Sequence, residues 1–188
     1  MPKTAARRPL EFASLDRVMP EVDRLLLGHS TAGNWSLGQI CRHLAWALTA
    51  SVDGFPRQAP WLFRRTIGRV LLKRLLKSGR MPEGAPVPGG GVPGPGLDDR
   101  AEAEALRAAL RFFVGHTGPL HEHPFFGPVT RAEAERIHCI HCAHHLSFVL
   151  PPVDESSRPA DSALSGEVRP TSFRPEDLRL KNVGGFVS

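Results

Sequence analysis

The stretch Ile137–Pro151, IHCIHCAHHLSFVLP, holds four histidines and two cysteines within eight positions and then continues as an apolar run. Its remaining residues are apolar on nearly every side of a helix, which is typical of a helix buried within a bundle. At about 100° per residue, His138, His141 and His145 fall on one side of that helix, whereas His144 points to another. We therefore predict a buried helix with three imidazoles that face the protein core.

Capping residues indicate where this helix and three other core helices begin and end. The predicted helices start after Ser14, Ser36, Asp98 or Asp99, and Thr130, and they end near Gly28, Ala50, Gly115 and Leu150. The second of them carries His43, and the last contains the histidine-rich stretch. Apolar residues recur along all four at the spacing of a helix, so we predict an all-α fold with one core, a four-helix bundle.

A fifth predicted helix, over residues 61–78, lies in a strongly basic part of the chain. Residues 57–80 hold eight basic residues and no acidic one, so this segment carries +8 against a net charge of +5 for the chain of 188 residues. A basic row at spacing four consists of Arg65, Arg69, Lys73 and Lys77, and the opposite arc consists of Phe63, Ile67, Val70, Leu71 and Leu75. We expect the basic row to face solvent and the apolar arc to pack inward.

Two segments are not predicted to contribute to the core. Residues 81–99 are dense in Pro and Gly, which predicts a long surface loop. Residues 152–188 have few large apolar side chains, so we expect a tail there, disordered or packed along the body, after a helical domain at 8–151.

The cysteines and the hydropathy of the chain bear on its compartment. Three cysteines, Cys41, Cys139 and Cys142, are an odd and small set, which argues against a disulfide framework and suits a reducing compartment. The sequence contains no apolar stretch long enough to span a membrane, and it has no secretory signal pattern. We therefore expect a cytoplasmic protein without membrane contact.

The spacing of the histidines favours a metal site. His141 and His145, four residues apart on a helix, offer two imidazoles to one ion, and His43 on a facing helix is the natural third ligand. A pair at this spacing also occurs on surfaces or as hydrogen-bonded core residues, and the spacing alone leaves that alternative open. Burial favours the ligand hypothesis, because an unpartnered buried imidazole costs about 1–3 kcal/mol.

Three motifs resemble the DinB-like superfamily of metal-binding four-helix bundles, and within it an uncharacterised branch. They are NWSLGQICRHLAWAL at 34–48, HPFFGPVT at 123–130 and HCIHCAHHLSF at 138–148, and the resemblance spans about Arg8 to Leu150. It implies ligands at His43, His141 and His145. The implied cofactor is a divalent ion, zinc, nickel or iron, with a position open to water or substrate, and some relatives hydrolyse small substrates or transfer low-molecular-weight thiols.

The first functional hypothesis is accordingly a metal-dependent small-molecule hydrolase or thiol S-transferase. Its substrate would be a small molecule, for example an anionic low-molecular-weight thiol that the basic row attracts. His138, one turn before His141, is the candidate general base or partner of a ligand, and its alternative role is to fill the core. A homodimer is compatible with these features. Imidazole ligands suit several ions, so the sequence does not name the metal.

The second hypothesis is a non-enzymatic binding module that uses the basic helix 61–78 on nucleic acid or another anionic partner. In that case the histidines would be structural. Trp61 and Phe63, the aromatic residues of this helix, both lie at its start, so the alternation of basic and aromatic side chains found in single-strand platforms is missing. We therefore do not expect nucleic acid as a partner, and we favour the enzyme.

Overall fold

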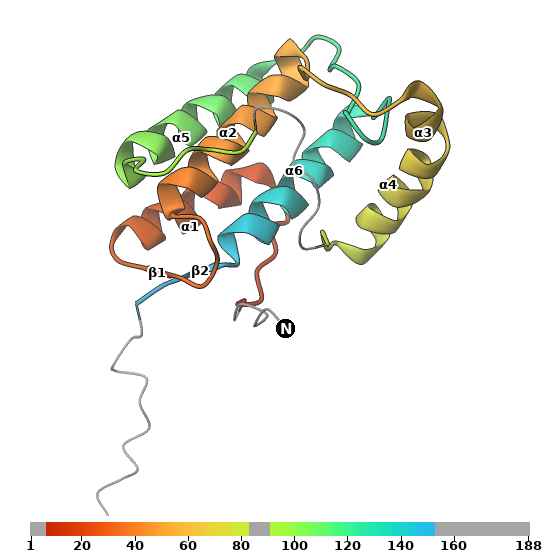
Figure 1. Cartoon of the computed structure of the whole chain (residues 1–188). Coiled ribbons are helices and arrows are strands. Elements are labelled where there is room, and N and C mark those ends of the chain that lie inside the picture. Colours follow the sequence, from red (N-terminus) through yellow and green to blue (C-terminus); the bar gives the residue numbers. More distant parts are fainter. Residues whose placement is uncertain (1–6, 83–90, 153–188) are drawn as a thin grey trace, which may run out of the picture. The chain divides into compact units, whose positions relative to one another are not determined.

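Six α-helices and one short pair of strands form the regular structure of residues 7–82 and 91–152, the part of the chain that the computed structural model describes. The helices are α1 (Val18–Leu26), α2 (Leu37–Asp53), α3 (Trp61–Arg65), α4 (Ile67–Ser78), α5 (Asp99–Gly115) and α6 (Arg131–Leu146). Strands β1 (Ser30–Thr31) and β2 (Val149–Leu150) pair antiparallel. The prediction of a mainly helical fold is confirmed (Figure 1). The predictions for 83–90 of the Pro/Gly loop and for the tail after Pro152 lie outside the described residues.

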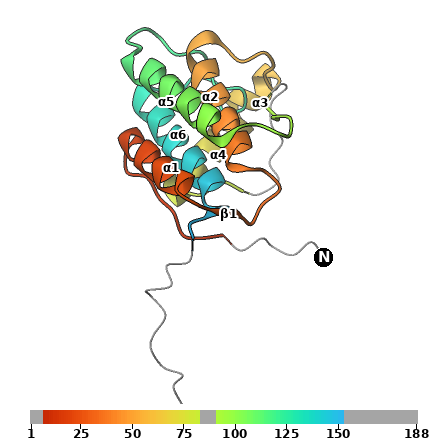
Figure 2. The same cartoon turned by 90° about the vertical axis from the view of Figure 1, so that its left-hand side faces the viewer.

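The core lies between α1, α2, α5 and α6, and two views at 90° show these helices side by side (Figures 1 and 2). α2 packs against both α5 and α6, and α1 packs against α5. The largest fully buried side chains come from all four helices and include Leu25, Leu44, Leu48, Leu106, Phe113 and Leu146. Each such side chain stabilises the fold by about 1.5–3 kcal/mol relative to an exposed one, so this core fixes α2 and α6 against each other.

Side-chain caps fix the starts of the helices that carry the histidines. Thr130 Oγ1 accepts from the backbone N–H of Glu133 at 3.2 Å, and Glu133 Oε2 accepts from the Thr130 N–H at 2.8 Å. Ser36 and Gln39 form the same reciprocal box at the start of α2, at 3.2 and 2.9 Å. Asp98 caps α5. The predicted starts of these helices are confirmed, because capping depends on residues only three positions apart.

The end of α6 differs from the prediction. The helix ends at Leu146 instead of Leu150, and Val149–Leu150 forms strand β2. The backbone N–H of Arg8 donates to the Ser147 carbonyl at 3.1 Å, and the Arg8 side chain donates to the Val149 carbonyl at 2.7 Å. These partners lie about 140 residues away along the chain, so the local apolar pattern could not indicate them.

The predicted helix 61–78 is two helices. The chain breaks at Thr66, which has φ −116° and ψ −87°, and α4 begins at the next residue. The inward face of α4 is also not the predicted one. Its buried residues are Gly68, Leu72 and Leu75, whereas Ile67, Val70 and Leu71 are exposed.

Close packing explains which face of α4 turns inward. Leu72 and Leu75 form a small apolar cluster with Ile137 and Ile140 of α6. At Gly68, a Cβ atom would overlap the carbonyl oxygen of Phe125, so only glycine allows this approach. The segment has more apolar residues than one face can bury, and the glycine decides which of them go inside.

None of the described helices has both the length and the apolar character that a membrane crossing requires.

Candidate metal centre

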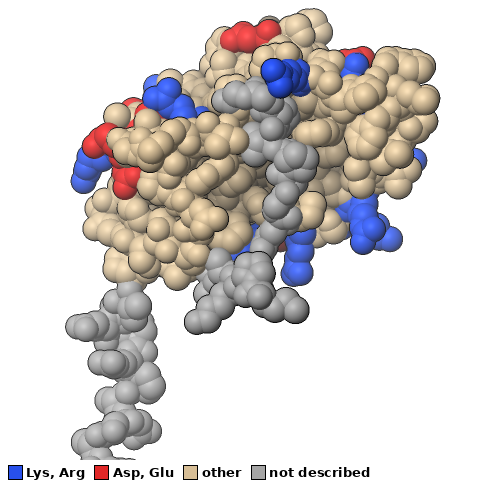
Figure 3. Space-filling model, in the orientation of Figure 1, with Lys and Arg blue, Asp and Glu red and all other residues tan. Residues whose placement is uncertain are grey.

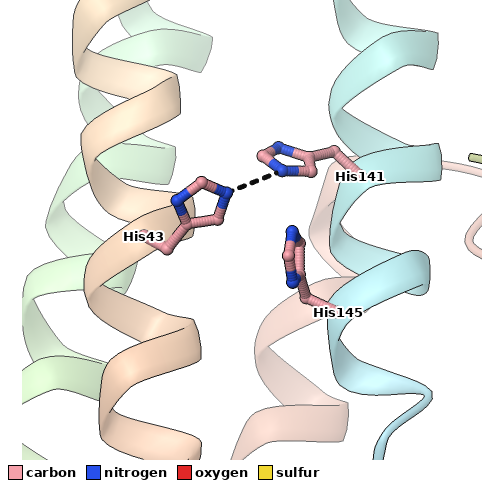
Figure 4. A group of neighbouring side chains, drawn as sticks. All are labelled: His43, His141 and His145. Carbon is pink, nitrogen blue, oxygen red and sulfur yellow. Dashed lines mark hydrogen bonds between the residues drawn. The ribbon is translucent and has the colours of Figure 1, made fainter. Parts of the chain in front are cut away.

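α2 and α6 bring three imidazoles together at one edge of the core. His43 projects from α2, and His141 and His145 project toward it from successive turns of α6 (Figure 4). One ring nitrogen from each residue can be chosen so that the three atoms lie within 4.8 Å of one another. The three rings therefore lie together as predicted, close enough to hold a metal ion.

A main-chain carbonyl fixes the tautomer of His43. Its Nδ1 lies 2.6 Å from the Gly91 carbonyl oxygen, which can only accept, so Nδ1 carries the hydrogen and donates it. The Nε2 atom of His43 is then left with a free lone pair that points at its neighbours. A metal-binding histidine needs this arrangement, with one nitrogen held by a hydrogen bond and the other free for the ion.

The contact between the two helices fits a metal ligand pair. His43 Nε2 lies 3.0 Å from His141 Nε2 and accepts a hydrogen bond from it. Two nitrogen ligands at about 2.0–2.1 Å from a tetrahedral zinc ion lie about 3.3 Å apart. For an ion to take the place of the shared hydrogen, His43 and His141 need to separate by only a few tenths of an ångström, with the His141 proton moved to its other nitrogen. The ligand atoms of all three histidines, which lie within 4.8 Å of one another, would also have to draw closer around the ion.

Burial keeps the three imidazoles neutral. The pKa of His43 is lowered by burial, and the hydrogen bond to Gly91 opposes this shift in part. The pKa of His141 and that of His145 are lowered first by burial and then by the neighbouring imidazoles, because protonation would place like charges side by side. Neutral imidazoles keep the lone pairs that metal binding requires.

Two tryptophans flank the cluster. The Trp35 ring stacks on His145, at 5.3 Å between centroids and 10° between planes, and also lies 5.1 Å from the His43 ring. On α2, Trp46 lies 6.1 Å from the His43 ring. His43 is buried, whereas His141 and His145 are partly exposed. The cluster thus has apolar aromatic walls and a side that solvent reaches.

His138 lies outside the cluster. The Ser51 hydroxyl donates to the Ala47 carbonyl at 3.0 Å, so it accepts from His138 Nε2–H at the same distance. The His138 ring also packs edge-on against Phe113, and burial lowers its pKa to about 4. These contacts explain how the protein accommodates a buried histidine without an ion. The predicted catalytic role of His138 stays a prediction.

Three histidines outside the cluster line a separate small cavity. His123 and His138 border a cavity of about 10 Å³, which has room for about one water molecule. His123 Nδ1 accepts from the backbone N–H groups of Phe125 and Phe126, so it orders its own turn. His121 also borders this cavity. None of these three residues belongs to the group that could hold the ion.

The three cysteines and His144 are buried and lie outside the group that could hold the ion. All three cysteines are free and buried, and burial raises the pKa of the Cys41 thiol to about 12, so it is protonated at neutral pH. The pKa values of Cys139 and Cys142 are also raised. The His144 Nδ1 atom lies 3.5 Å from the Arg7 guanidinium, and its ring packs against Phe148. Cys139 and Cys142, three positions apart on α6, are therefore core residues.

The contacts that support the imidazoles were not predicted. Nothing in the sequence singles out the Gly91 carbonyl, because Gly91 is one of three consecutive glycines in a run rich in Pro and Gly. Ser51 could have been predicted as a hydrogen-bond partner for a histidine of the facing helix, since it lies eight residues after His43, about two helical turns along α2. Trp35 and Trp46 both appear in the motif at 34–48. The stacking of Trp35 on His145 depends on how α6 packs beside the start of α2, whereas Trp46 lies three residues after His43 on the same helix.

The fold and the site together define a helical protein with a partly buried three-histidine cluster, a candidate metal centre. The chain belongs to the family described as Protein of unknown function (DUF1569), which it matches over residues 4–152. Comparison with curated proteins gave no match, and neither did comparison with solved structures.

The flanking tryptophans give a direct optical test of ion binding. Titration with Ni²⁺ is expected to quench tryptophan fluorescence, because an open-shell ion on these imidazoles would lie within a few ångströms of two indole rings. Trp35→Phe and Trp46→Phe should each lose part of the quenched intensity, whereas Trp61→Phe on α3 should retain it. Quenching that disappears only with Trp61→Phe would place the ion elsewhere.

Proposed function

We propose that this chain is a DinB-like metal protein that holds a divalent ion on His43, His141 and His145. Zinc, nickel and iron all suit three imidazole ligands. The observation that carries the proposal is the orientation of His43: a carbonyl accepts its Nδ1–H, and its unprotonated Nε2 faces two neutral imidazoles of another helix. In the proposed four-helix bundle, α1, α2, α5 and α6 supply the scaffold.

We propose further that the protein is a metal-dependent small-molecule hydrolase or thiol S-transferase. A divalent ion supplies Lewis acidity and lowers the pKa of a water or thiol at its open position. The partly exposed edges of His141 and His145 support access for a small molecule. A thiol that carries carboxylates fits a chain with net charge +5.

The protein's own residues would orient the ligands and limit water at this site. The Gly91 carbonyl holds the His43 ring, and the parallel contact with Trp35 restricts rotation of the His145 ring. Trp35 and Trp46 would also offer apolar faces to the non-reacting part of a substrate. His138, which donates to Ser51, would hold α2 against α6 one turn away from the ligands. That contact supports a structural role for it rather than that of a general base.

Metal loading followed by activity assays tests the proposal. Untagged protein is stripped with a chelator, reloaded with Zn²⁺, Ni²⁺ or Fe²⁺, and analysed for bound metal. It is then assayed for hydrolysis of 4-nitrophenyl acetate and for transfer of glutathione to a chromogenic electrophile. We expect the reloaded protein to hold close to one ion per chain and to regain activity. The His43→Ala variant should not regain activity on reloading.

The matched control for these assays is His116→Ala. His116 is only partly buried and caps the end of α5, outside the cluster, so this variant should keep both metal and activity. Failure of the reloaded protein to retain an ion would refute the metal centre. An ion retained without turnover of either probe would support the centre and count against these two reactions.

A further inference from the structure

The outward side of α3 and α4 presents large apolar side chains to solvent. The exposed fractions are 62% for Trp61, 65% for Leu62, 55% for Ile67, 66% for Val70 and 43% for Leu71. A run of exposed apolar residues on adjoining elements marks an interaction surface, unlike single scattered ones. We call this set, together with Lys73, Arg74 and Lys77, the α3–α4 outer face.

Basic side chains lie on the same arc of α4 as the apolar ones. At 100° per residue, Val70 lies between Lys77 and Arg74, and Ile67 follows Arg74 around the helix. Lys73, Arg74 and Lys77 are exposed, and in 7–82 and 91–152 no carboxylate forms an ion pair with any of them. Figure 3 shows blue side chains and no red ones along the edge of the molecule where α4 lies.

Two other basic residues of this segment, Arg64 and Arg69, are already engaged. Arg64 is buried and binds Glu122 and the Ala59 carbonyl. Arg69 donates to the Pro128 carbonyl at 2.6 Å and lies 3.8 Å from Glu133. These contacts hold α3 and α4 on the body of the protein and leave the outer-face cations free to bind a partner.

The composition of the outer face discriminates among partners. A second copy of the chain docked symmetrically on this face would place two sets of unpaired cations together, and their repulsion opposes such a dimer. Nucleic acid would satisfy the cations through its phosphates but would leave the aliphatic side chains in water. A surface with anionic groups above an apolar layer satisfies both kinds of side chain.

We propose that the α3–α4 outer face is a docking surface for an anionic lipid bilayer, in place of the expectation from the sequence that the protein has no membrane contact. Helices that lie at bilayer interfaces combine cations for the headgroups with Trp and aliphatic side chains for the acyl boundary. Lys and Arg side chains can bury their aliphatic stems while their charges reach the headgroups. Trp61, with the Arg65 guanidinium 5.9 Å from its ring centroid, has the paired apolar and charged character of an interfacial anchor.

Vesicle sedimentation with the full chain tests this inference. We expect binding to phosphatidylcholine vesicles that contain 25% phosphatidylglycerol, and little binding to pure phosphatidylcholine. The triple variant Lys73→Gln, Arg74→Gln, Lys77→Gln should weaken binding about 100-fold, since each cation near an anionic surface contributes about 1 kcal/mol. The double variant Ile67→Ser, Val70→Ser should weaken binding about tenfold or more, because it removes only apolar contact.

A second triple variant matches the loss of charge elsewhere. Arg17→Gln, Arg100→Gln, Arg111→Gln also removes three exposed cations, from other parts of the surface, and should bind nearly as well as the parent. All the substituted residues are exposed, so circular dichroism should show unchanged helix content.

Three results would each overturn the inference. The first is equal sedimentation with both vesicle compositions. The second is loss of binding to the same extent in the two charge variants, which would show a net-charge effect. The third is the absence of vesicle binding together with another interaction that the outer-face variants abolish. That interaction would be either binding to a nucleic acid duplex at physiological salt or self-association.

Discussion

Replacement of His145 with alanine is expected to abolish stoichiometric metal binding and the thermal stabilisation that the ion confers. Loss of a residue that only supports a ligand typically costs 10–100-fold in metal affinity, so loss of a ligand should cost more than about 100-fold. An ion at 100 times its dissociation constant stabilises the folded state by about 2.7 kcal/mol, and that increment should vanish. Chelator competition and thermal melts with and without Zn²⁺ measure both effects.

His144→Gln is the matched control for this variant. His144 directly precedes His145 on α6 and is buried, and its ring lies 4.9 Å from the ring of His145. Glutamine keeps an acceptor for the Arg7 guanidinium, which lies 3.5 Å from His144 Nδ1. This variant should bind the ion like the parent. Equal loss of metal in both variants would show that the ligand set is wrong.

Gly68→Ala should cause the largest loss of stability among small substitutions, roughly 2–3 kcal/mol. The new methyl group would overlap the carbonyl oxygen of Phe125, which belongs to the backbone and cannot turn aside as a side chain can. Either α4 moves off α6 or the Phe125 turn shifts. Urea unfolding followed by circular dichroism measures the change in the free energy of unfolding.

Gly115→Ala provides the comparison for Gly68→Ala. Gly115 is the last residue of α5, and a Cβ atom there meets nothing within 4 Å. Because alanine favours helix more than glycine does, this change should be neutral or slightly stabilising. If both variants unfold at the parent's urea concentration, then the close approach at Gly68 does not hold α4 in place.

Local signals made the starts of α2, α5 and α6 predictable from the sequence, whereas Ser14 forms no side-chain cap and α1 begins only at Val18, after a 3-10 turn at Leu15–Arg17. Ser36 and Thr130 each satisfy a free N–H group three residues later, and such contacts form wherever the helix forms. The end of α6 could not be predicted this way, because Val149 and Leu150 pair with β1 instead of continuing the helix. A long-range partner overrode a local apolar pattern.

The same contrast applies to the candidate site. Helical periodicity placed His141 and His145 on one side, and burial of α2 and α6 brought His43 to them, so the cluster could be predicted. The periodicity also grouped His138 with them, although its hydrogen bond goes to Ser51 on the neighbouring helix. On α4, apolar residues occupy two arcs, and only the contact at Gly68 decides which arc is buried.

The support of His43 by Gly91 bears on how such a site can be inherited. The contact uses the carbonyl oxygen of the main chain, which every amino acid possesses, rather than a side chain. Substitutions in that loop can therefore accumulate without loss of the acceptor, as long as the backbone keeps its path. We expect related chains to retain the three histidines while the residue that orients His43 drifts in identity, so a comparison of aligned columns would overlook it.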